Sequence, residues 1–239
     1  MRVSVIIPAL NESDRIGAAI DSARAARCDE VLVADGGSID GTRELAARHG
    51  AQVIEAPRGR AFQQNAASRV AIGDVLLFLH ADNRLGGACA SQIIDAFTAD
   101  SIRVCGAFRQ RIDAPELGFR IVEWGNAFRA GRLGLPYGDQ ALFFRREAFE
   151  RFGRFPETPF LEDFILMRRV RRAARPLLLP GPIHVDARRW KRRGIVAQVV
   201  RNWTILGAYA IGVPPERLAR WYPRHDRDAS ARRAPRSEA

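Results

Sequence analysis

The sequence is poor in lysine, in cysteine and in long apolar stretches, and each shortage excludes a class of protein. Lys191 is the only lysine among 38 basic residues, and all the others are arginine. A glycine-rich, lysine-bearing phosphate loop is missing near the N-terminus, which argues against nucleotidyl transfer. The three cysteines form neither a Cys-x-x-Cys pair nor a zinc-ligand pattern. They therefore predict buried thiols in a reducing cytoplasm rather than a disulfide framework.

The N-terminal apolar run is too short for a signal peptide and no small-residue cleavage site follows it, so we expect the mature chain to begin at Met1. With 239 residues, of which 47% are hydrophobic and 27% charged, the chain suits a soluble globular protein with a sizeable core. Its formal net charge of +11 favours anionic partners such as phosphates, nucleotides, anionic lipid headgroups or nucleic acid.

Short apolar segments alternate with helical patterns along the first part of the chain. This alternation is typical of βαβ units and predicts a mostly parallel, doubly wound sheet with right-handed crossovers. The second part is less regular and includes a glycine-rich loop over residues 131–140. We expect strands over residues 3–8, 30–34, 51–55, 74–79, 103–110 and 141–145, and helices over residues 16–23, 42–48, 61–71, 116–130 and 162–174.

We expect a single domain over residues 1–223, because no segment is rich enough in Pro, Gly or Ser to separate two domains. Within it, residues 1–98 form a nucleotide-binding half, residues 99–190 an acceptor-binding and catalytic half, and residues 191–223 C-terminal helices. Residues 224–239 carry arginine, alanine, serine and aspartate without apolar periodicity, which predicts a disordered basic tail.

Residues 195–213 are nearly long enough to cross a bilayer, but the central Arg201 makes a membrane span expensive. Two interpretations stay open. The segment is either an amphipathic helix that packs on the core, or a helix in a membrane interface. In the second case the cations of residues 188–193 meet anionic headgroups, and the protein is peripheral at the inner face of the plasma membrane.

Polar clusters follow three of the predicted strands, where ligands of such sheets bind. They are Asn11-Glu12, Asp35-Gly36-Gly37-Ser38 and His80-Ala81-Asp82. Asp35 is either an acceptor for a base or ribose edge or the cap of an ordinary turn. Asp82 is either a ligand of a divalent metal that bridges a diphosphate or a helix cap.

Two adjacent carboxylates, Glu162 and Asp163, begin a predicted helix. The helix dipole alone explains such a pair, and the alternative is a general base within reach of an acceptor hydroxyl.

Taken together, these residues resemble the family-2 glycosyltransferases, whose nucleotide-binding α/β fold is called GT-A. The resemblance implies a Rossmann-like, mostly parallel central sheet flanked by helices, with a smaller acceptor-binding part and a C-terminal helical segment. It is carried by five blocks in the family's order, namely Val5-Ile6-Ile7-Pro8-Ala9-Leu10-Asn11-Glu12, Val33-Ala34-Asp35-Gly36-Gly37-Ser38-Ile39-Asp40-Gly41-Thr42, Gly59-Arg60-Ala61-Phe62-Gln63-Gln64-Asn65-Ala66-Ala67, Leu79-His80-Ala81-Asp82 and Glu162-Asp163.

The Gly-Arg-Ala-x-Gln and Leu-His-Ala-Asp forms of two blocks are most similar to a subgroup of small stand-alone bacterial enzymes. That subgroup is associated with glycosylation of small molecules, including arsenosugar pathways. The resemblance therefore implies a hexosyltransferase that moves a sugar from a nucleotide-sugar, in the family commonly a UDP-sugar, to a small-molecule or lipid acceptor, with inversion at the anomeric carbon. No specific nucleic-acid partner is expected.

The resemblance also implies a role for each matching residue. The nucleotide-sugar site would comprise Pro8, Leu10, Glu12, Asp35, Gly36, Arg60, Gln64, His80, Ala81 and Asp82. Of these, Glu12 would reach the ribose, Asp35 the uracil edge and Arg60 the diphosphate. Asp82, the second position of the family's Asp-x-Asp motif, would bind Mg²⁺ or Mn²⁺. Asp163 would deprotonate the acceptor, oriented by Glu162.

Two positions depart from the family's pattern. His80 replaces the first Asp of Asp-x-Asp, which removes a carboxylate near the sugar. Arg189 and Trp190 match only the end of the Gln-x-x-Arg-Trp motif of processive members, so processive synthesis is not expected. We expect these two residues, with Gly138, Asp139 and Gln140, to face the acceptor.

One function outside catalysis stays open, because the +11 charge also suits a non-catalytic nucleotide-binding or nucleic-acid-binding module. The arginines are scattered along the chain, however, and no aromatic-rich RNA-binding strand pattern accompanies them.

Overall fold

A computed structural model describes residues 1–188, 190 and 194–221 of the chain. Its centre is an eight-stranded sheet with the strand order β3-β2-β1-β4-β7-β6-β8-β5. The pairs β1–β2, β1–β4, β2–β3 and β6–β8 are parallel and the other three pairs are antiparallel. The strands are β1 (Val3–Ala9), β2 (Glu30–Asp35), β3 (Gln52–Glu55), β4 (Val75–Phe78), β5 (Asn83–Leu85), β6 (Cys105–Ile112), β7 (Phe143–Arg145) and β8 (Leu177–Val185).

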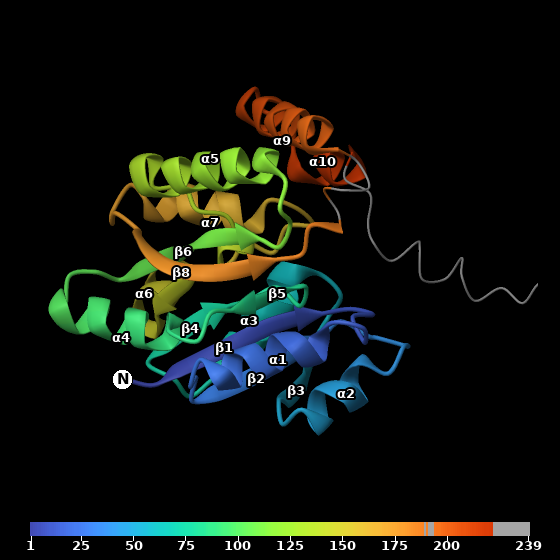
Figure 1. Cartoon of the computed structure of the whole chain (residues 1–239), viewed down its shortest axis with the longest axis vertical. Coiled ribbons are helices and arrows are strands. Elements are labelled where there is room, and N and C mark those ends of the chain that lie inside the picture. The colour runs from blue at the N-terminus through green and yellow to red at the C-terminus, as the bar shows by residue number, and fades with distance from the viewer. Residues whose placement is uncertain (189, 191–193, 222–239) are drawn as a thin grey trace, which may run out of the picture.

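Helices cover both faces of this sheet (Figure 1). One apolar core lies between the sheet and α1 (Ile16–Ala25), α2 (Thr42–Arg48) and α4 (Cys89–Ala99). The second core lies on the opposite face, against α3 (Arg60–Val70), α6 (Arg146–Arg151) and α7 (Glu162–Val170). Side chains alternate across β1, so that Val5 and Ile7 enter the first core and Ile6 the second.

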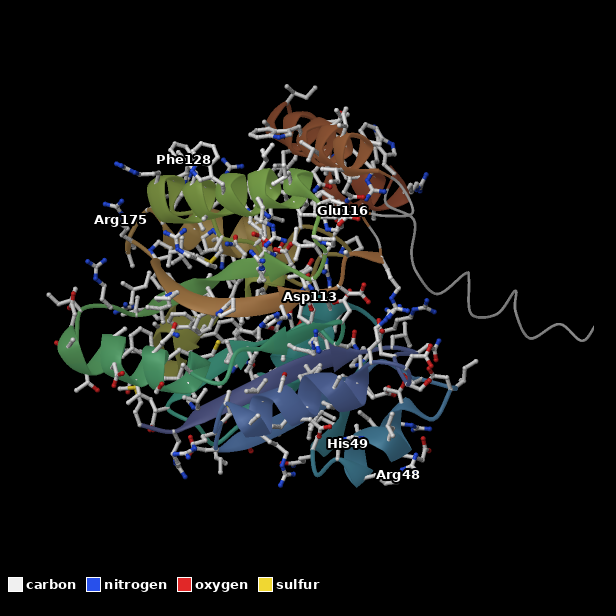
Figure 2. The ribbon with its side chains drawn as sticks, viewed as in Figure 1. Arg48, His49, Asp113, Glu116, Phe128 and Arg175 are labelled. Carbon is white, nitrogen blue, oxygen red and sulfur yellow. The ribbon has the colours of Figure 1, made fainter. Side chains whose placement is uncertain are left out.

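Three further helices lie at the end of the molecule farthest from β3, at the top of Figure 1. They are α5 (Leu117–Leu133), α9 (Ile195–Ala210) and α10 (Pro215–Trp221). The side chain of Phe128 points outward from α5, away from the sheet (Figure 2). Among the described residues, no helix is long and apolar enough to cross a membrane.

The structure confirms the α/β class, the mixed and mostly parallel sheet and the flanking helices. Each of the six predicted strands is present with ends shifted by a few residues, and two short or late strands, β5 and β8, were not predicted. The loop expected over residues 131–140 begins as the last turn of α5 and ends in a 3₁₀ turn, Gly138–Gln140. The proposed division into halves remains a prediction, and the expected tail, residues 224–239, lies outside the described residues.

The cysteines are structural thiols in the described fold. Cys89 and Cys105 are buried and Cys28 is half-buried, and none forms a disulfide. Burial raises the pKa of Cys28 and Cys105 to about 12 and that of Cys89 to about 11. All three therefore stay protonated and unreactive at neutral pH.

Candidate active site

Hydrogen bonds join the loop that follows β1 to the loop that follows β2, and the two loops together form one edge of the site. Asn11, after β1, adopts a left-handed conformation with φ 55°. Its backbone N–H donates to Ser38 Oγ at 2.9 Å, and its own Oδ1 accepts from the Ile39 N–H at 3.0 Å. The Glu12 N–H donates to Thr42 Oγ1 at 2.9 Å. The block after β1 and the block after β2 are thus held as one rigid unit.

Asp35 is the last residue of β2, and only one of its two carboxylate oxygens accepts hydrogen bonds. Its side chain is buried, and Oδ2 accepts from the backbone N–H groups of Gly37 and Ser38 at 2.9 Å each. Oδ1 is buried without a hydrogen-bond partner among the described residues. A buried unpaired acceptor costs free energy, roughly 1–3 kcal/mol, unless a ligand supplies a donor. Asp35 is therefore poised to accept a hydrogen bond from a bound molecule.

Gln63, which the sequence analysis did not assign, fastens the strand ends beneath this carboxylate. Its Nε2 donates to the carbonyl oxygens of Ala9 at 2.6 Å and Ala34 at 2.8 Å. A Cβ at Gly36 would lie 3.0 Å from that nitrogen, which explains a glycine there. The neighbouring Gln64 is buried, and its Oε1 has no partner in the described part of the chain.

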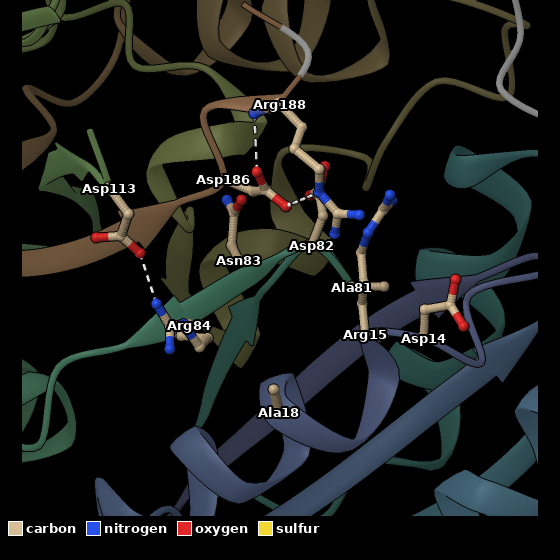
Figure 3. A pocket seen from close by; sticks show the side chains of 10 residues that line it. All are labelled: Asp14, Arg15, Ala18, Ala81, Asp82, Asn83, Arg84, Asp113, Asp186 and Arg188. Carbon is tan, nitrogen blue, oxygen red and sulfur yellow. Dashed lines mark hydrogen bonds and ion pairs between the residues drawn. The ribbon is translucent and has the colours of Figure 1, made fainter. Parts of the chain in front are cut away.

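Asp82 lies in an open cavity of about 300 Å³ where carboxylates and guanidinium groups alternate (Figure 3). Arg188 donates to Asp186 through its backbone N–H and its Nε. The side-chain hydrogen bond to Asp186, together with the charges of Asp186, Asp14 and Asp82, raises the pKa of Arg188. The lining residues are Asp14, Arg15, Ala18, Ala81, Asp82, Asn83, Arg84, Asp113, Asp186 and Arg188.

This cavity can hold a divalent cation only together with phosphate oxygens of a bound substrate. No group of three His, Cys, Asp or Glu side chains with metal-ligand geometry occurs among the described residues. The oxygen donors present are those that Mg²⁺ and Mn²⁺ prefer, and such ions often bind through one or two carboxylates and substrate phosphates. The residues therefore fit a metal held by Asp82 and a diphosphate, which the arginines would also bind.

A second, smaller cavity of about 130 Å³ contains four more of the candidate residues. Its polar residues include Arg60, His80, Asp139 and Asp163, and α9 contributes one wall. The remaining lining is mostly apolar and consists of Tyr137, Phe160, Leu161, Phe164, Asn202, Ile205 and Leu206.

Asp163 is held in one orientation beside His80. Its Oδ2 accepts from the Gly138 N–H at 2.6 Å and its Oδ1 from the Phe164 N–H at 2.7 Å. A Cβ at Gly138 would lie 3.0 Å from both Asp163 Oδ2 and His80 Nε2, so these three residues meet at one point. Glycine at position 138 lets the carboxylate and the imidazole approach each other.

Glu162 is buried and pairs with Arg60 rather than facing the cavity. Glu162 Oε1 lies 2.9 Å from Arg60 Nε, which joins α7 to the start of α3. Burial raises the pKa of Glu162, an effect that Arg60 opposes and the nearby Asp163 reinforces. The pKa of His80 is lowered by burial and by the charge of Arg60, which favours a neutral imidazole.

The segment Gly138-Asp139-Gln140 divides into one structural side chain and one that faces the cavity. Gln140 is fully buried, and its Oε1 accepts from the Tyr137 N–H and from Arg129, each at 3.2 Å. Its side chain therefore shapes the loop, unlike the acceptor contact expected from the sequence. Asp139 lines the cavity, and its Oδ1 is buried without a partner in the described fold.

The two residues matched to the Arg-Trp motif contribute differently. Trp190 packs edge-to-face on Phe119 with ring centroids 6.4 Å apart, and it does not line either cavity described above. Arg189 lies outside the described residues. Of the sequence-predicted residues, the structure thus brings Arg60, His80, Asp139 and Asp163 into one cavity and places Ala81 and Asp82 in the other.

Comparison with known families assigns the chain. The sequence model of the glycosyl transferase family 2 matches residues 4–169, which is well over half of the chain. The chain belongs to this family, as the five blocks of the sequence indicated.

Curated relatives are similar over shorter segments. The chain is 36% identical over 122 residues to an uncharacterized glycosyltransferase, YfnE, of Bacillus subtilis, covering 47% of this chain and 31% of that one. It is 38% identical over 95 residues to a glucosyl-3-phosphoglycerate synthase of Mycolicibacterium paratuberculosis, covering 34% and 28%. The matches thus span about a third of these relatives.

Solved structures share the fold. A mannosyltransferase of Pyrobaculum calidifontis, in complex with GDP-Man and Mn²⁺, superposes with a TM-score of 0.64 at 22% identity, covering 87% of this chain and 61% of that one. The glucosyl-3-phosphoglycerate synthase of Mycobacterium tuberculosis, in complex with Mn²⁺, UDP and phosphoglyceric acid, has a TM-score of 0.58 at 18% identity, covering 89% and 79%.

Proposed function

We propose that the protein is an inverting, metal-dependent glycosyltransferase that moves a sugar from a nucleotide-sugar to a hydroxyl group. The observation that carries this proposal is the position of His80-Ala81-Asp82 between two cavities. Ala81 and Asp82 line the cavity rich in carboxylates and arginines, while His80 lies beside Asp163 in the other. A donor diphosphate in the cavity that contains Asp82 would present its sugar to an acceptor in the cavity that contains Asp163.

The nucleotide would bind along the carboxyl ends of β1 and β2. The unpaired Oδ1 of Asp35 accepts a base N–H, which suits the N3–H of uracil. Pro8 and Leu10 flank the base, Glu12 reaches the ribose, and Gly36 allows close approach. UDP is the nucleotide in the mycobacterial neighbour and GDP-Man the donor in the archaeal one, so both bases belong in a test.

The metal would sit between Asp82 and the diphosphate. When bound, Mg²⁺ or Mn²⁺ neutralises charge on the departing nucleoside diphosphate. Arg188 lines the same cavity and would bind phosphate oxygens. Arg60 and Gln64 complete the donor site. The ion pair with Glu162 holds Arg60 in place there.

The chemical step uses Asp163 as the base. Asp163 takes the proton of the acceptor hydroxyl, and that oxygen attacks the anomeric carbon on the face opposite the diphosphate. The carbon–oxygen bond to the diphosphate breaks, its electron pair leaves with the nucleotide, and the configuration inverts. Two backbone N–H groups keep the carboxylate in position, and Glu162 holds the start of α7 through Arg60.

The acceptor would contact Asp139 and the backbone at Gly138, with Trp190 and Gln140 shaping the surroundings. The apolar walls contributed by Phe160, Phe164 and α9 suit an acceptor with an apolar part. We therefore propose a small-molecule or lipid acceptor. The arsenosugar-type small molecules of the resembling subgroup belong in an acceptor screen, and a reducing cytoplasm is the proposed location.

A thermal-shift measurement tests the donor site. We expect UDP, among UDP, GDP, dTDP and ADP, to raise the melting temperature most, and only with Mn²⁺ or Mg²⁺ present. Ligand at a hundred times its dissociation constant adds about 2.7 kcal/mol of stability. The shift should disappear in Asp35→Ala and Asp82→Ala. If no nucleotide shifts the melting temperature, and random oligonucleotides bind instead in a salt-sensitive way, the non-catalytic nucleic-acid module replaces this proposal.

A further inference from the structure

Helix α5 buries Phe119, Ala127 and Ala130 beside a row of hydrogen-bonded polar side chains, and it exposes a stripe of large apolar side chains. Arg120 Nη2 donates to the carbonyl oxygens of Ile112 and Ala114, and Glu123 Oε1 accepts from the Ile112 N–H. Asn126 Nδ2 donates to Gln110 Oε1. The outward positions are apolar over three turns: Leu117 is 81% exposed, Ile121 71%, Trp124 69% and Phe128 49%. A helix exposes such a stripe at a cost unless something covers it.

Helix α9 repeats this arrangement. Gln198 is buried and accepts at Oε1 from Arg201, and its Nε2 donates to Asn202. Ile205, on the same inward side, lines the cavity that contains Asp163. The outward positions Val196, Val200 and Trp203 are 75%, 58% and 67% exposed.

The two apolar stripes adjoin. The Ile195 side chain lies 2.8 Å from where a Cβ of Gly118 would be, so the start of α9 packs on the start of α5. Phe119, Val122, Trp190 and Ile195 form one cluster at this junction. We call the exposed side chains on both helices, Leu117, Ile121, Trp124, Phe128, Val196, Val200 and Trp203, the α5–α9 face.

Basic residues are frequent in the sequence beside this face. In the sequence, five of the six residues from 188 to 193 are basic, directly before α9. The neighbouring helix α10 exposes Arg217, Arg220 and, at 51%, Trp221. A second copy of a chain with net charge +11 would bring like charges together at this face, whereas an anionic surface would be attracted to it. Exposed tryptophans beside cations are typical of the membrane interface.

We propose that the α5–α9 face docks on a membrane that contains anionic lipid, with its apolar side chains in the headgroup region and Arg217 and Arg220 of α10 on lipid phosphates. Attachment of this kind needs no membrane-spanning helix. Because α9 also forms a wall of the Asp163 cavity, docking would bring that cavity close to the membrane surface, a consequence that rests on the proposed function.

Vesicle binding by the full chain tests the proposal. We expect it to float with vesicles of 70% phosphatidylcholine and 30% phosphatidylglycerol at low salt, and to bind pure phosphatidylcholine much less. Two of the four tryptophans, Trp124 and Trp203, belong to the α5–α9 face. Their transfer from water into the headgroup region should shift the tryptophan fluorescence to the blue, and brominated lipid should quench this fluorescence. Recovery in the supernatant, or binding without a blue shift or quenching, would overturn insertion of this face.

A matched pair of variants separates the face from net charge. The double variant Ile121→Gln with Trp124→Gln removes two outward side chains of α5 and should weaken vesicle partitioning tenfold or more. The control, Ile72→Gln with Ile102→Gln, removes two side chains that are 57% and 85% exposed elsewhere and should bind like the wild type. Equal binding by both variants would show attraction by cations alone and refute docking by the face. A vesicle-free dimer that only the first variant disrupts would also refute it, in favour of self-association.

Discussion

Replacing Asp163 with asparagine is expected to lower the rate of sugar transfer by about 10²- to 10⁴-fold, the range that a positioned general base supplies. Asparagine has nearly the same shape but cannot take the acceptor proton. It keeps one oxygen for the backbone N–H groups of Gly138 and Phe164 and loses one of these two bonds, at a cost of about 1–3 kcal/mol. The variant should therefore fold and still bind nucleotide, which steady-state kinetics and thermal shift would show together.

The matched control is Asp100→Asn. The Asp100 carboxylate also accepts a backbone N–H, that of Ile102, and bonds Arg103, each at 3.0 Å, but it lines neither cavity described above. The Asp100→Asn variant should therefore transfer sugar at the same rate as the wild type. Wild-type turnover by Asp163→Asn would remove Asp163 as the base and leave the reaction without one.

Replacing Asp82 with alanine should remove the metal dependence of both binding and turnover. Metal-ion stabilisation of developing charge contributes several kcal/mol, so the loss should be at least about a hundredfold in turnover. The rate should no longer respond to added Mn²⁺, because two of the other three carboxylates of the cavity are paired, Asp186 with Arg188 and Asp113 with Arg84 and His184.

For this second prediction the control is Asp21→Ala, a variant of an exposed carboxylate on α1 that bonds His49. It should keep both its rate and its response to the metal. Should Asp82→Ala instead retain a manganese-stimulated rate, another carboxylate must hold the metal, and the assignment of Asp82 as its ligand would be wrong.

Much of the donor side could be predicted from the sequence because it is built from local signals. The β-branched run of β1 and the turn at Asp35-Gly36-Gly37-Ser38 mark strand ends by themselves, and parallel strands bring their carboxyl ends to one edge. The positions of Asp35 and Asp82 followed from that rule. Their roles came from the family resemblance and remain proposals.

Other features depend on contacts between distant residues and left no local signal. β5 has three residues and forms only because it pairs with β8 a hundred residues later. Gln63 looks like an ordinary helical glutamine, yet it bonds two strand ends. Gln140 looked like a polar loop residue, but Arg129 and the Tyr137 N–H draw it into the core.

The orientation of helices α5 and α9 was not predicted from the sequence, for a different reason. Hydrophobic periodicity reveals that a helix has two faces but not which one is inward. On α5, Arg120 and Glu123 lie on the packed side with the buried Phe119, because β6 and its following turn offer backbone groups to them. On α9, Gln198 takes the buried position that an apolar residue would usually occupy. The two interpretations of residues 195–213 therefore describe its two sides, one packed and one exposed.

A crystal of the protein grown with UDP and Mn²⁺, measured at the manganese absorption edge, tests the central claim most directly. We expect an anomalous peak within bonding distance of the Asp82 carboxylate, a diphosphate beside it, and the uracil ring hydrogen-bonded to Oδ1 of Asp35. A peak on a different carboxylate, or the edge of β1 and β2 empty at saturating UDP, would contradict it.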